Sequence, residues 1–305
     1  MITLYKEESL KGTPPEERSV EELIHNSLVI IDKPVGPTSH EAAAFAKKIL
    51  GIKKAGHSGT LDYNVSGVLP VLLDNATKAA GFLLKEKKEY VCLMKTGEKK
   101  TREELDDVFT RFKGKIYQTP PLASAVVKKL RIREIFELEI LEAQDDLVLF
   151  KANVEAGTYI RTLCFHAGEV LGCGAEMAEL RRTIAAGFTE EQAITLQELT
   201  DFYWLWKEKG DETRLRKALI PIEKAVSLKK VIASDGALKP ITTGANLAVP
   251  GILSLDDGIR KGDYVQILTG RGEIACFAKA LMASQEIQRK KNGMAFDVER
   301  VVKQF

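Results

Sequence analysis

The sequence contains few residues that could hold a metal ion or a disulfide framework. Structural zinc sites and disulfide-rich secreted domains need closely spaced Cys pairs or Cys and His pairs. The four histidines show no metal-ligand spacing, and the four cysteines include no C-x-x-C pair. The cysteines are Cys92, Cys164, Cys173 and Cys276. We therefore expect neither a bound metal nor disulfides.

Long apolar runs are also lacking. The sequence has no run of ~18 apolar residues, so no segment is predicted to span a membrane. Residues 1–23 are charged from Lys6 onward and lack the apolar stretch of a signal peptide. We expect a cytoplasmic protein that makes no membrane contact.

Neither basic nor acidic residues are in large excess. The 45 basic residues face 43 acidic ones, which gives a net charge of +2. Free-standing nucleic-acid-binding proteins are often far more basic, so any contact with RNA must come from local patches. The 305 residues exceed the usual length of one domain, and we start from an expectation of two.

Helix and strand signals alternate over the first two thirds of the chain. The apolar run at 27–33 predicts a buried strand, and Thr38 with Glu41 forms a capping box for a helix that ends at Gly51. A second capping box predicts a helix that ends at Gly114. Other predicted elements are a hairpin over 133–155 and helices over 158–171, near 175–183 and up to about 226.

Two further segments have a distinct composition. Residues 55–67 are rich in glycine and turn formers, which predicts a loop, and Pro70 in the apolar strand that follows indicates an edge strand or a bulge. After about residue 228, short apolar segments alternate with Gly and Asp turns. Such a pattern predicts a small barrel-like β module, with a domain boundary near 227.

Three side chains suggest chemistry. Asp62 is the single carboxylate of the glycine-rich loop, although an Asp in such a loop more often caps a turn. Arg161 falls in the first turn of a predicted helix, where the helix dipole disfavours a cation. A carboxylate or an RNA phosphate is therefore expected beside it, unless it is simply solvated. Tyr90 begins an alternating strand among lysines, where a half-buried structural tyrosine is the ordinary case.

The glycine-rich segment HSGTLDYNVSGVLPVLLDNATK resembles the signature of the TruB/dyskerin family of pseudouridine synthases, in which G-T-L-D and S/T-G-x-L-P surround the catalytic aspartate. LVIIDKPVGPTSHE, KEYVCLMK, AGTYIRTLC and MAELRRT resemble the remaining motifs, in the family's order. GANLAVPGI, DDGIRKGDYVQIL and AKALMAS resemble a PUA domain. The resemblance runs from about residue 27 to the end. YWLWKEKGDETRLRKALIPIEKAV looks most like the archaeal version of dyskerin.

This resemblance implies an α+β fold. The pseudouridine synthase part, residues 27–227, should have a mixed, largely antiparallel central sheet flanked by helices. Residues 228–305 should form a small β-barrel-like PUA domain that binds RNA. Residues 1–26 should form an N-terminal extension that packs on the PUA domain.

The resemblance also assigns the catalytic residues. Asp62 is implied to start cleavage of the N1–C1′ glycosidic bond of uridine, either as a nucleophile or as a base. Tyr90 is implied to stack on the flipped base, and Arg161 to pair with the aspartate. The base detaches, rotates and reattaches through C5, so no cofactor is expected.

Further residues are implied in binding RNA. Lys33 either supports the catalytic loop or contacts substrate, and His57 either helps to open the RNA or supports the same loop. Arg182 is a phosphate or base contact, or alternatively a solvated helix arginine. The basic run at 128–133 suits RNA backbone contacts, although charge runs are more often solvated faces. The other implicated residues are Leu180, Arg181, Lys128, Lys129 and Arg131.

We expect an RNA pseudouridine synthase acting on rRNA or tRNA under the direction of a box H/ACA guide RNA. The expected companions are a small zinc-ribbon protein, a small β-barrel protein and a kink-turn-binding protein that joins through the RNA. A stand-alone enzyme for the T-loop uridine of tRNA is the alternative. A non-catalytic RNA-binding scaffold is a third hypothesis, disfavoured because Asp62, Tyr90 and Arg161 are all present.

The chain departs from the family pattern in three places. Tyr63 follows the catalytic aspartate where the family usually has proline. Thr119 and Ala123 stand where relatives often have basic residues, and residues 185–187 replace a more usual stretch containing Gly and Pro. These departures concern loop rigidity and RNA contacts rather than the catalytic trio.

Overall fold

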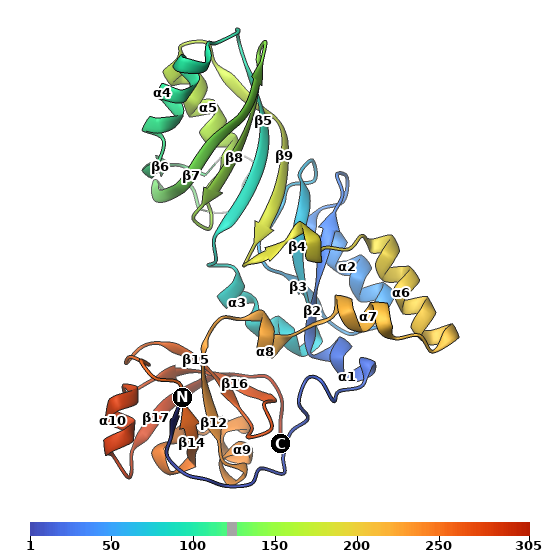
Figure 1. The fold of residues 1–305 in the computed structure, drawn as a ribbon, viewed down its shortest axis with the longest axis vertical. Helices are drawn as coiled ribbons and strands as arrows, with labels where there is room; N and C mark the ends of the chain where they lie inside the picture. Colours follow the sequence, from blue (N-terminus) through green and yellow to red (C-terminus); the bar gives the residue numbers. More distant parts are fainter. Residues whose placement is uncertain (121–126) are drawn as a thin grey trace.

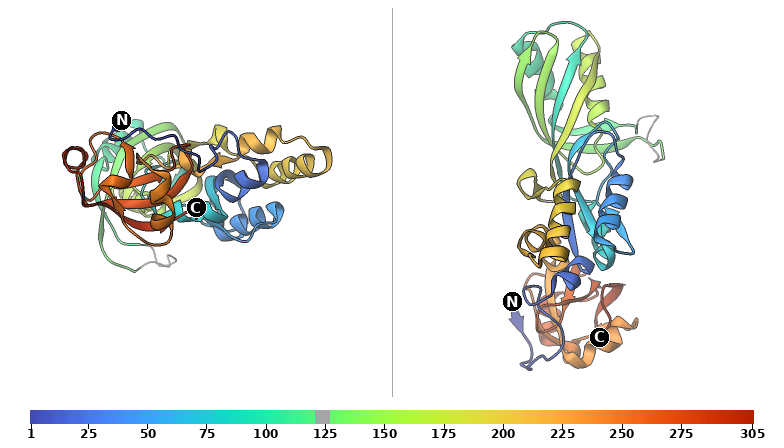
Figure 2. Two further views of the ribbon diagram at one scale, coloured as in Figure 1. Left: turned by 90° about the horizontal axis from the view of Figure 1, so that it is seen from below. Right: turned by 90° about the vertical axis from the view of Figure 1, so that its right-hand side faces the viewer.

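Two β-sheets organise the chain (Figure 1). In the computed structural model, which describes residues 1–120 and 127–305, one sheet has ten strands and the other has seven. Figure 2 shows three tiers along the long axis: the outer part of the large sheet with α4 and α5, its inner part with α2 and α6, and the seven-stranded sheet. Within the described ranges, no helix is long and apolar enough to cross a membrane.

The ten-stranded sheet has the order β11-β2-β4-β9-β5-β8-β7-β6, with β3 paired to β4 and β10 paired to β9. Its pairings are antiparallel except between β4 and β9. The strands are β2 (Ser27–Lys33), β3 (Ala55–His57), β4 (Ser66–Leu73), β5 (Lys88–Thr96), β6 (Gly114–Gln118), β7 (Arg131–Gln144), β8 (Leu147–Val154), β9 (Ala175–Ala185), β10 (Phe188–Thr189) and β11 (Ile220–Pro221).

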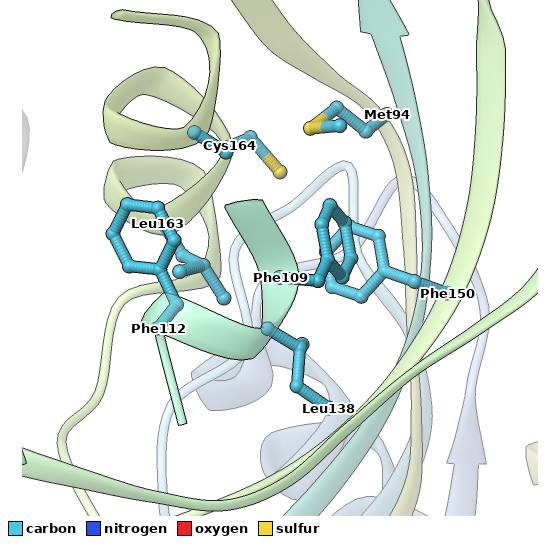
Figure 3. A pocket seen from close by; sticks show the side chains of 8 residues that line it. Met94, Phe109, Phe112, Leu138, Phe150, Leu163 and Cys164 are labelled. Atoms are coloured by element: carbon cyan, nitrogen blue, oxygen red, sulfur yellow. The ribbon is translucent and has the colours of Figure 1, made fainter. Parts of the chain in front are cut away.

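Helices cover this sheet in two groups. α4 and α5 pack on β5, β7 and β8, and α1, α2 and α6 pack on β2 and β4. Figure 3 shows the interior of the first group, where the space between α4, α5 and the sheet is lined by apolar side chains and the Cys164 thiol. The helices are α1 (Val20–His25), α2 (Ser39–Leu50), α3 (Ala80–Leu83), α4 (Arg102–Arg111), α5 (Ile160–Leu171), α6 (Leu196–Lys209), α7 (Thr213–Ala218) and α8 (Ile222–Ala225).

The seven-stranded sheet has the order β1-β14-β12-β15-β16-β17-β13. Its first strand comes from the N-terminus: Ile2 and Thr3 pair with Leu255 and Ser254. The elements are β1 (Ile2–Thr3), β12 (Lys229–Ala233), α9 (Asp235–Thr242), β13 (Leu247–Ala248), β14 (Ile252–Leu255), β15 (Tyr264–Leu268), β16 (Ile274–Ala280), α10 (Ser284–Arg289) and β17 (Met294–Val301). One apolar cluster runs from Leu28 and Leu72 of the large sheet to Phe277 of this sheet, so the two share a core.

Local signals explain several element boundaries. At α2, the Thr38 hydroxyl accepts from the Glu41 N–H, the Glu41 carboxylate accepts from the Thr38 N–H, and Gly51 ends the helix with φ 65°. The expected hairpin is β7 and β8, joined at Asp145 and Asp146. These predictions are confirmed.

Other sequence predictions are wrong. Residues 175–183, predicted as helix, lie in β9, because pairing with β5 outweighs the helix propensity of Ala, Glu, Met and Leu. The loop predicted at 55–67 contains the strand β3. α4 ends at Arg111, so that Gly114 begins β6 instead of ending the helix.

Pro70 lies inside the sheet, not at an edge. Pro70 is opposite Ile30 in β2. Its carbonyl points away from β2 and accepts from the Ser58 N–H. Because the N and C=O of one strand residue face the same side, the missing N–H removes no hydrogen bond to β2.

Candidate active site

The loop that carries Asp62 is held on both sides of the aspartate. Ser39, the first residue of α2, accepts from the Leu61 N–H at 2.7 Å and donates to the Leu61 carbonyl at 3.0 Å. After Asp62, the Val65 N–H closes a turn on the Asp62 carbonyl at 3.1 Å, and Gly36 donates to the Tyr63 carbonyl at 2.8 Å. The backbone is fixed, while the Asp62 side chain stays 53% exposed.

Asp62 forms an ion pair with Arg161. One Arg161 nitrogen lies 2.7 Å from a carboxylate oxygen of Asp62, and the Arg161 side chain is 41% exposed. Arg161 is the second residue of α5, where no side chain caps the helix. The carboxylate therefore supplies the negative charge expected beside a cation at this end of the helix dipole. Exposed ion pairs stabilise little, so both groups are open to a ligand.

Tyr90 lies in β5, near the centre of the sheet. It is half-buried, and its Cα partners are Ala152 on β8 and Arg182 on β9. β9 lies next to β4, which leads out of the Asp62 loop, and β5 lies next to β9. Tyr90 therefore lies on a group of three consecutive strands, β4, β9 and β5, of which β4 continues directly from the Asp62 loop.

A glycine and an arginine join β4 to β9 beneath the loop. A Cβ on Gly67, which has φ 107°, would lie 2.2 Å from the Arg182 carbonyl oxygen, so only glycine allows the two strands to approach this closely. Arg182 is 1% exposed and donates to the carbonyls of Val68, at 2.8 Å, and Gly59, at 3.2 Å. It is a buried strand residue that holds the loop, so the alternative of a solvated helix arginine is wrong.

Two buried lysines lie near Arg182. Lys33 is fully buried and donates to the carbonyls of Pro34 and Pro37 at 2.8 and 2.7 Å. Lys88 is 5% exposed and donates to the carbonyls of Leu84 and Glu86. Burial, followed by the charge of Arg182, lowers the pKa of Lys33, and the same causes lower the pKa of Lys88 to about 8.

Lys88 was missed by the sequence analysis. The available signal was its place two residues before Tyr90, which puts both side chains on one face of β5. His57, at the end of β3, is half-buried. Burial, and then Arg182, lowers its pKa, and its buried Nδ1 has no hydrogen-bond partner within the described ranges.

The other implicated residues are placed differently. Arg181 donates to both oxygens of Asp32 at 3.1 Å and to one of Glu190 at 2.5 Å, and the hydrogen bonds that Asp32 accepts raise the pKa of Arg181. Leu180 packs against the core under α4 and α5. Lys128 and Lys129 are exposed, and Arg131 bonds the Val127 carbonyl at the start of β7. Thr119 is exposed, and Ala123 lies outside the described residues.

The arrangement supplies one accessible carboxylate with a guanidinium beside it and buried cations behind its loop. Such a carboxylate can attack an electrophilic carbon or accept a proton. In the described part of the chain, no group of three or more His, Cys, Asp or Glu side chains could hold a metal ion.

Comparisons with known proteins cover nearly the whole chain. Family models match in order: the DKCLD (NUC011) domain at 5–43, the TruB family pseudouridylate synthase N-terminal domain at 47–160, the tRNA pseudouridylate synthase B C-terminal domain at 161–227 and the PUA domain at 229–302. Proteins named probable tRNA pseudouridine synthase B from Methanosarcina barkeri and Pyrococcus furiosus are 49% and 50% identical over 95% of this chain and 86% of their own.

Solved structures give the same result. The chain resembles one in a Cbf5-Nop10-Gar1 complex with a TM-score of 0.89 and 47% identity, over 100% of this chain and 94% of that one. It also resembles a chain in an H/ACA RNP bound to a substrate RNA containing 2′-deoxyuridine, with a TM-score of 0.88 and 45% identity, over 99% and 94%.

Proposed function

The chain belongs to the TruB/dyskerin family of pseudouridine synthases, and on this premise we propose that it isomerises uridines in rRNA or tRNA that a box H/ACA guide RNA presents to Asp62. The observation that carries the proposal is the Asp62–Arg161 pair, half-exposed on a loop whose backbone is fixed at Leu61 and Tyr63.

The proposed chemistry follows from this geometry. A uridine within a helix or a stacked loop must first be flipped out to reach the carboxylate. Asp62 either attacks C1′ or removes a ribose proton, and the N1–C1′ bond breaks with its electron pair on the base. The base rotates and C5 bonds to C1′, while the Asp62–C1′ bond breaks or the ribose proton returns. C5 then loses its proton and N1 takes one up. Atoms and electrons balance without a cofactor. Arg161 orients the carboxylate, and Tyr90 stacks on the base.

The remaining residues are proposed to act around this centre. Lys33 holds the loop after β2 through the carbonyls of Pro34 and Pro37. Arg182 holds the Asp62 loop through the Gly59 carbonyl and offers positive charge behind it. His57 lies beside the same loop, where it either meets the RNA or supports the backbone. Residues proposed to face the RNA on either side are Leu180, Arg181, Lys128, Lys129 and Arg131.

Guide dependence is supported by the near-full-length likeness to chains solved with Nop10, Gar1 and H/ACA RNA. The net charge of +2 also suits a subunit that shares its RNA with other proteins. The proposed companions are proteins like Nop10 and Gar1, with a kink-turn-binding protein joined through the RNA. Because rRNA and tRNA are the proposed substrates, we place the activity in the cytoplasm.

A stand-alone tRNA enzyme is the second candidate. It is favoured by the relatives that are named tRNA pseudouridine synthase B. The active site would be the same, since only the means of holding the RNA differs. The choice therefore depends on the substrate that is turned over.

Pseudouridine yield on two substrates tests the proposal. One reaction holds unmodified tRNA and the protein alone, and the other holds a short target RNA with an H/ACA guide and the companion proteins. We expect product in the second reaction only. Asp62→Asn, which keeps the shape of the side chain but removes its charge, should lower the yield by at least about 10³-fold while RNA affinity changes by only a few-fold.

Each contrary result has a definite meaning. Product from tRNA alone would favour the stand-alone enzyme. Turnover by Asp62→Asn near the wild-type rate would refute the role of Asp62. No product from the wild-type protein in either reaction would favour the scaffold hypothesis.

A further inference from the structure

Tyr63, the residue after Asp62, exposes its ring to solvent. Its side chain is 65% exposed and has no hydrogen bond or ring contact to the rest of residues 1–120 and 127–305. Val35, on the loop after β2, is 63% exposed, and the two loops are joined where the Gly36 N–H donates to the Tyr63 carbonyl. A single exposed apolar residue needs no explanation. Here an aromatic and an aliphatic side chain stand on joined loops beside the reacting carboxylate.

The backbone under Tyr63 is well suited to present a ring. Asp62 and Val65 are the ends of a hydrogen-bonded turn, so Tyr63 is its second residue, and Leu61 before the turn is held by Ser39. That turn position favours proline, which the family usually has here. A tyrosine at this place has only two side-chain torsions to order, so a partner can be bound at a small entropic cost.

We propose that Tyr63 is a stacking platform for an unpaired base next to the target uridine. When the uridine leaves its stack, the neighbouring bases lose a partner on one face. An exposed aromatic ring on the adjoining loop can replace that partner, and base–aromatic stacking tolerates any base. Val35 supplies a second apolar contact on the joined loop.

The chemistry of the site favours a nucleobase over an apolar ligand. Asp62, the residue before Tyr63, forms a charged pair with Arg161, and the buried cations Lys33, Lys88 and Arg182 lie behind the loop. An apolar ligand would gain nothing from these charges, whereas RNA has both a stacking face and an anionic backbone. This inference rests on the proposed function, because it requires an RNA substrate with a flipped uridine.

The test uses target RNAs that have 2-aminopurine on the 5′ or 3′ side of the uridine. They are mixed with the full chain, its companions and the guide. Stacking on an aromatic ring quenches 2-aminopurine, so wild-type protein and Tyr63→Phe should quench one of the two labels. Tyr63→Ala should lose the quenching and raise KM for the target about tenfold, the size expected for one base–aromatic stack, with the loss in KM rather than kcat.

Trp204→Ala is the matched control, since Trp204 is 51% exposed on α6 and its removal should change neither signal. Equal quenching by Tyr63→Ala and wild-type protein would overturn the proposal, as would a loss in both Tyr63→Ala and Tyr63→Phe, which would point to the hydroxyl. Fluorescence and pseudouridine yield are measured separately. If the wild-type protein quenched the label but made no product, the proposed function would fail and the platform would stand.

Discussion

Two regions of the molecule bury charged side chains in opposite ways. Where the N-terminal extension meets α8 and the seven-stranded sheet, cationic side chains are paired with carboxylates. Behind the Asp62 loop, Lys33, Lys88 and Arg182 are all positive, and none forms an ion pair within the described ranges. Most of these side chains are nearly inaccessible to water, so the difference concerns the group to which each charge is bonded.

At the junction, Arg18 is 1% exposed and bonds both oxygens of Glu223, at 3.1 and 2.6 Å. It also lies 3.2 Å from Glu273, which in turn accepts from Lys303 at 2.7 Å and from the Thr13 N–H at 2.9 Å. Two cations and two carboxylates thus balance, and the network joins the extension, α8 and the β15–β16 turn.

Behind the loop, the acceptors are backbone carbonyls. Carbonyl dipoles satisfy the N–H groups but do not cancel the charge, so the region retains a positive potential. Like charges held in a protein interior without partners lower stability and are typical of functional sites. The comparison indicates that the charges of the junction neutralise one another, whereas the charges behind Asp62 leave the region beneath the loop positive.

Breaking the balanced network should have the largest effect on stability. Arg18→Met removes the cation that binds both oxygens of Glu223 and leaves Glu273 with Lys303 as its remaining cation, so we expect the free energy of unfolding to fall by about 3–5 kcal/mol. Urea unfolding measures this change. Arg271→Met is the control, because Arg271 pairs with Glu17 at the surface with side-chain exposures of 40% and 58%. That exposed pair should contribute at most about 1 kcal/mol. Equal losses of unfolding free energy in the two variants would show that the buried network is no stronger than a surface ion pair.

Removing one of the unpaired cations should lower stability less than Arg18→Met does, and it should lower catalytic activity. Arg182→Met loses the bonds to the Val68 and Gly59 carbonyls but also relieves a desolvated charge, so we expect a loss of about 1–3 kcal/mol in urea unfolding. Because Arg182 holds the loop, kcat should fall about tenfold or more while the Kd for RNA stays within about twofold.

The neighbouring Arg181→Met is the matched control for stability, since Arg181 is 39% exposed and bonded to carboxylates. It should lose no more than about 1 kcal/mol. If Arg182→Met instead weakened RNA binding and flattened its salt dependence, Arg182 would be a phosphate contact and not a positioning residue.

Much of this architecture was predicted from the sequence. The family, the α+β fold class with a C-terminal PUA domain and the pseudouridine synthase activity are confirmed by the family matches and the solved relatives. Helices such as α2 were predicted because their caps are local: Thr38, Glu41 and Gly51 interact within one helix. Asp62 and Arg161 were singled out separately, and the structure brings them together across 99 residues of sequence.

The errors arose where distant segments decide the outcome. β9 has the composition of a helix and becomes a strand because β5 and β4 flank it. Pro70 fits inside the sheet because its nitrogen faces away from β2. Lys88 is buried where Lys87 is exposed, and in the sequence only the strand alternation that places Lys88 on the same face as Tyr90 distinguishes the two lysines.

The smallest expected effect is a change in the free energy of unfolding with pH that depends on Lys88. The pKa of Lys88 is lowered from 10.5 to about 8 by burial and then by Arg182, so between those values the unfolded chain binds more protons at this site than the folded protein does. Its contribution to stability therefore rises with pH across that window, by about 1 kcal/mol between pH 8 and 9.

Urea unfolding at both pH values should show this rise in the wild-type protein and in Lys87→Met, which removes the exposed ammonium next to Lys88. Lys88→Met should lack the rise. If Lys88→Met kept the full rise, Lys88 would not be an unpaired buried cation, and the contrast with the balanced junction would fail at this residue.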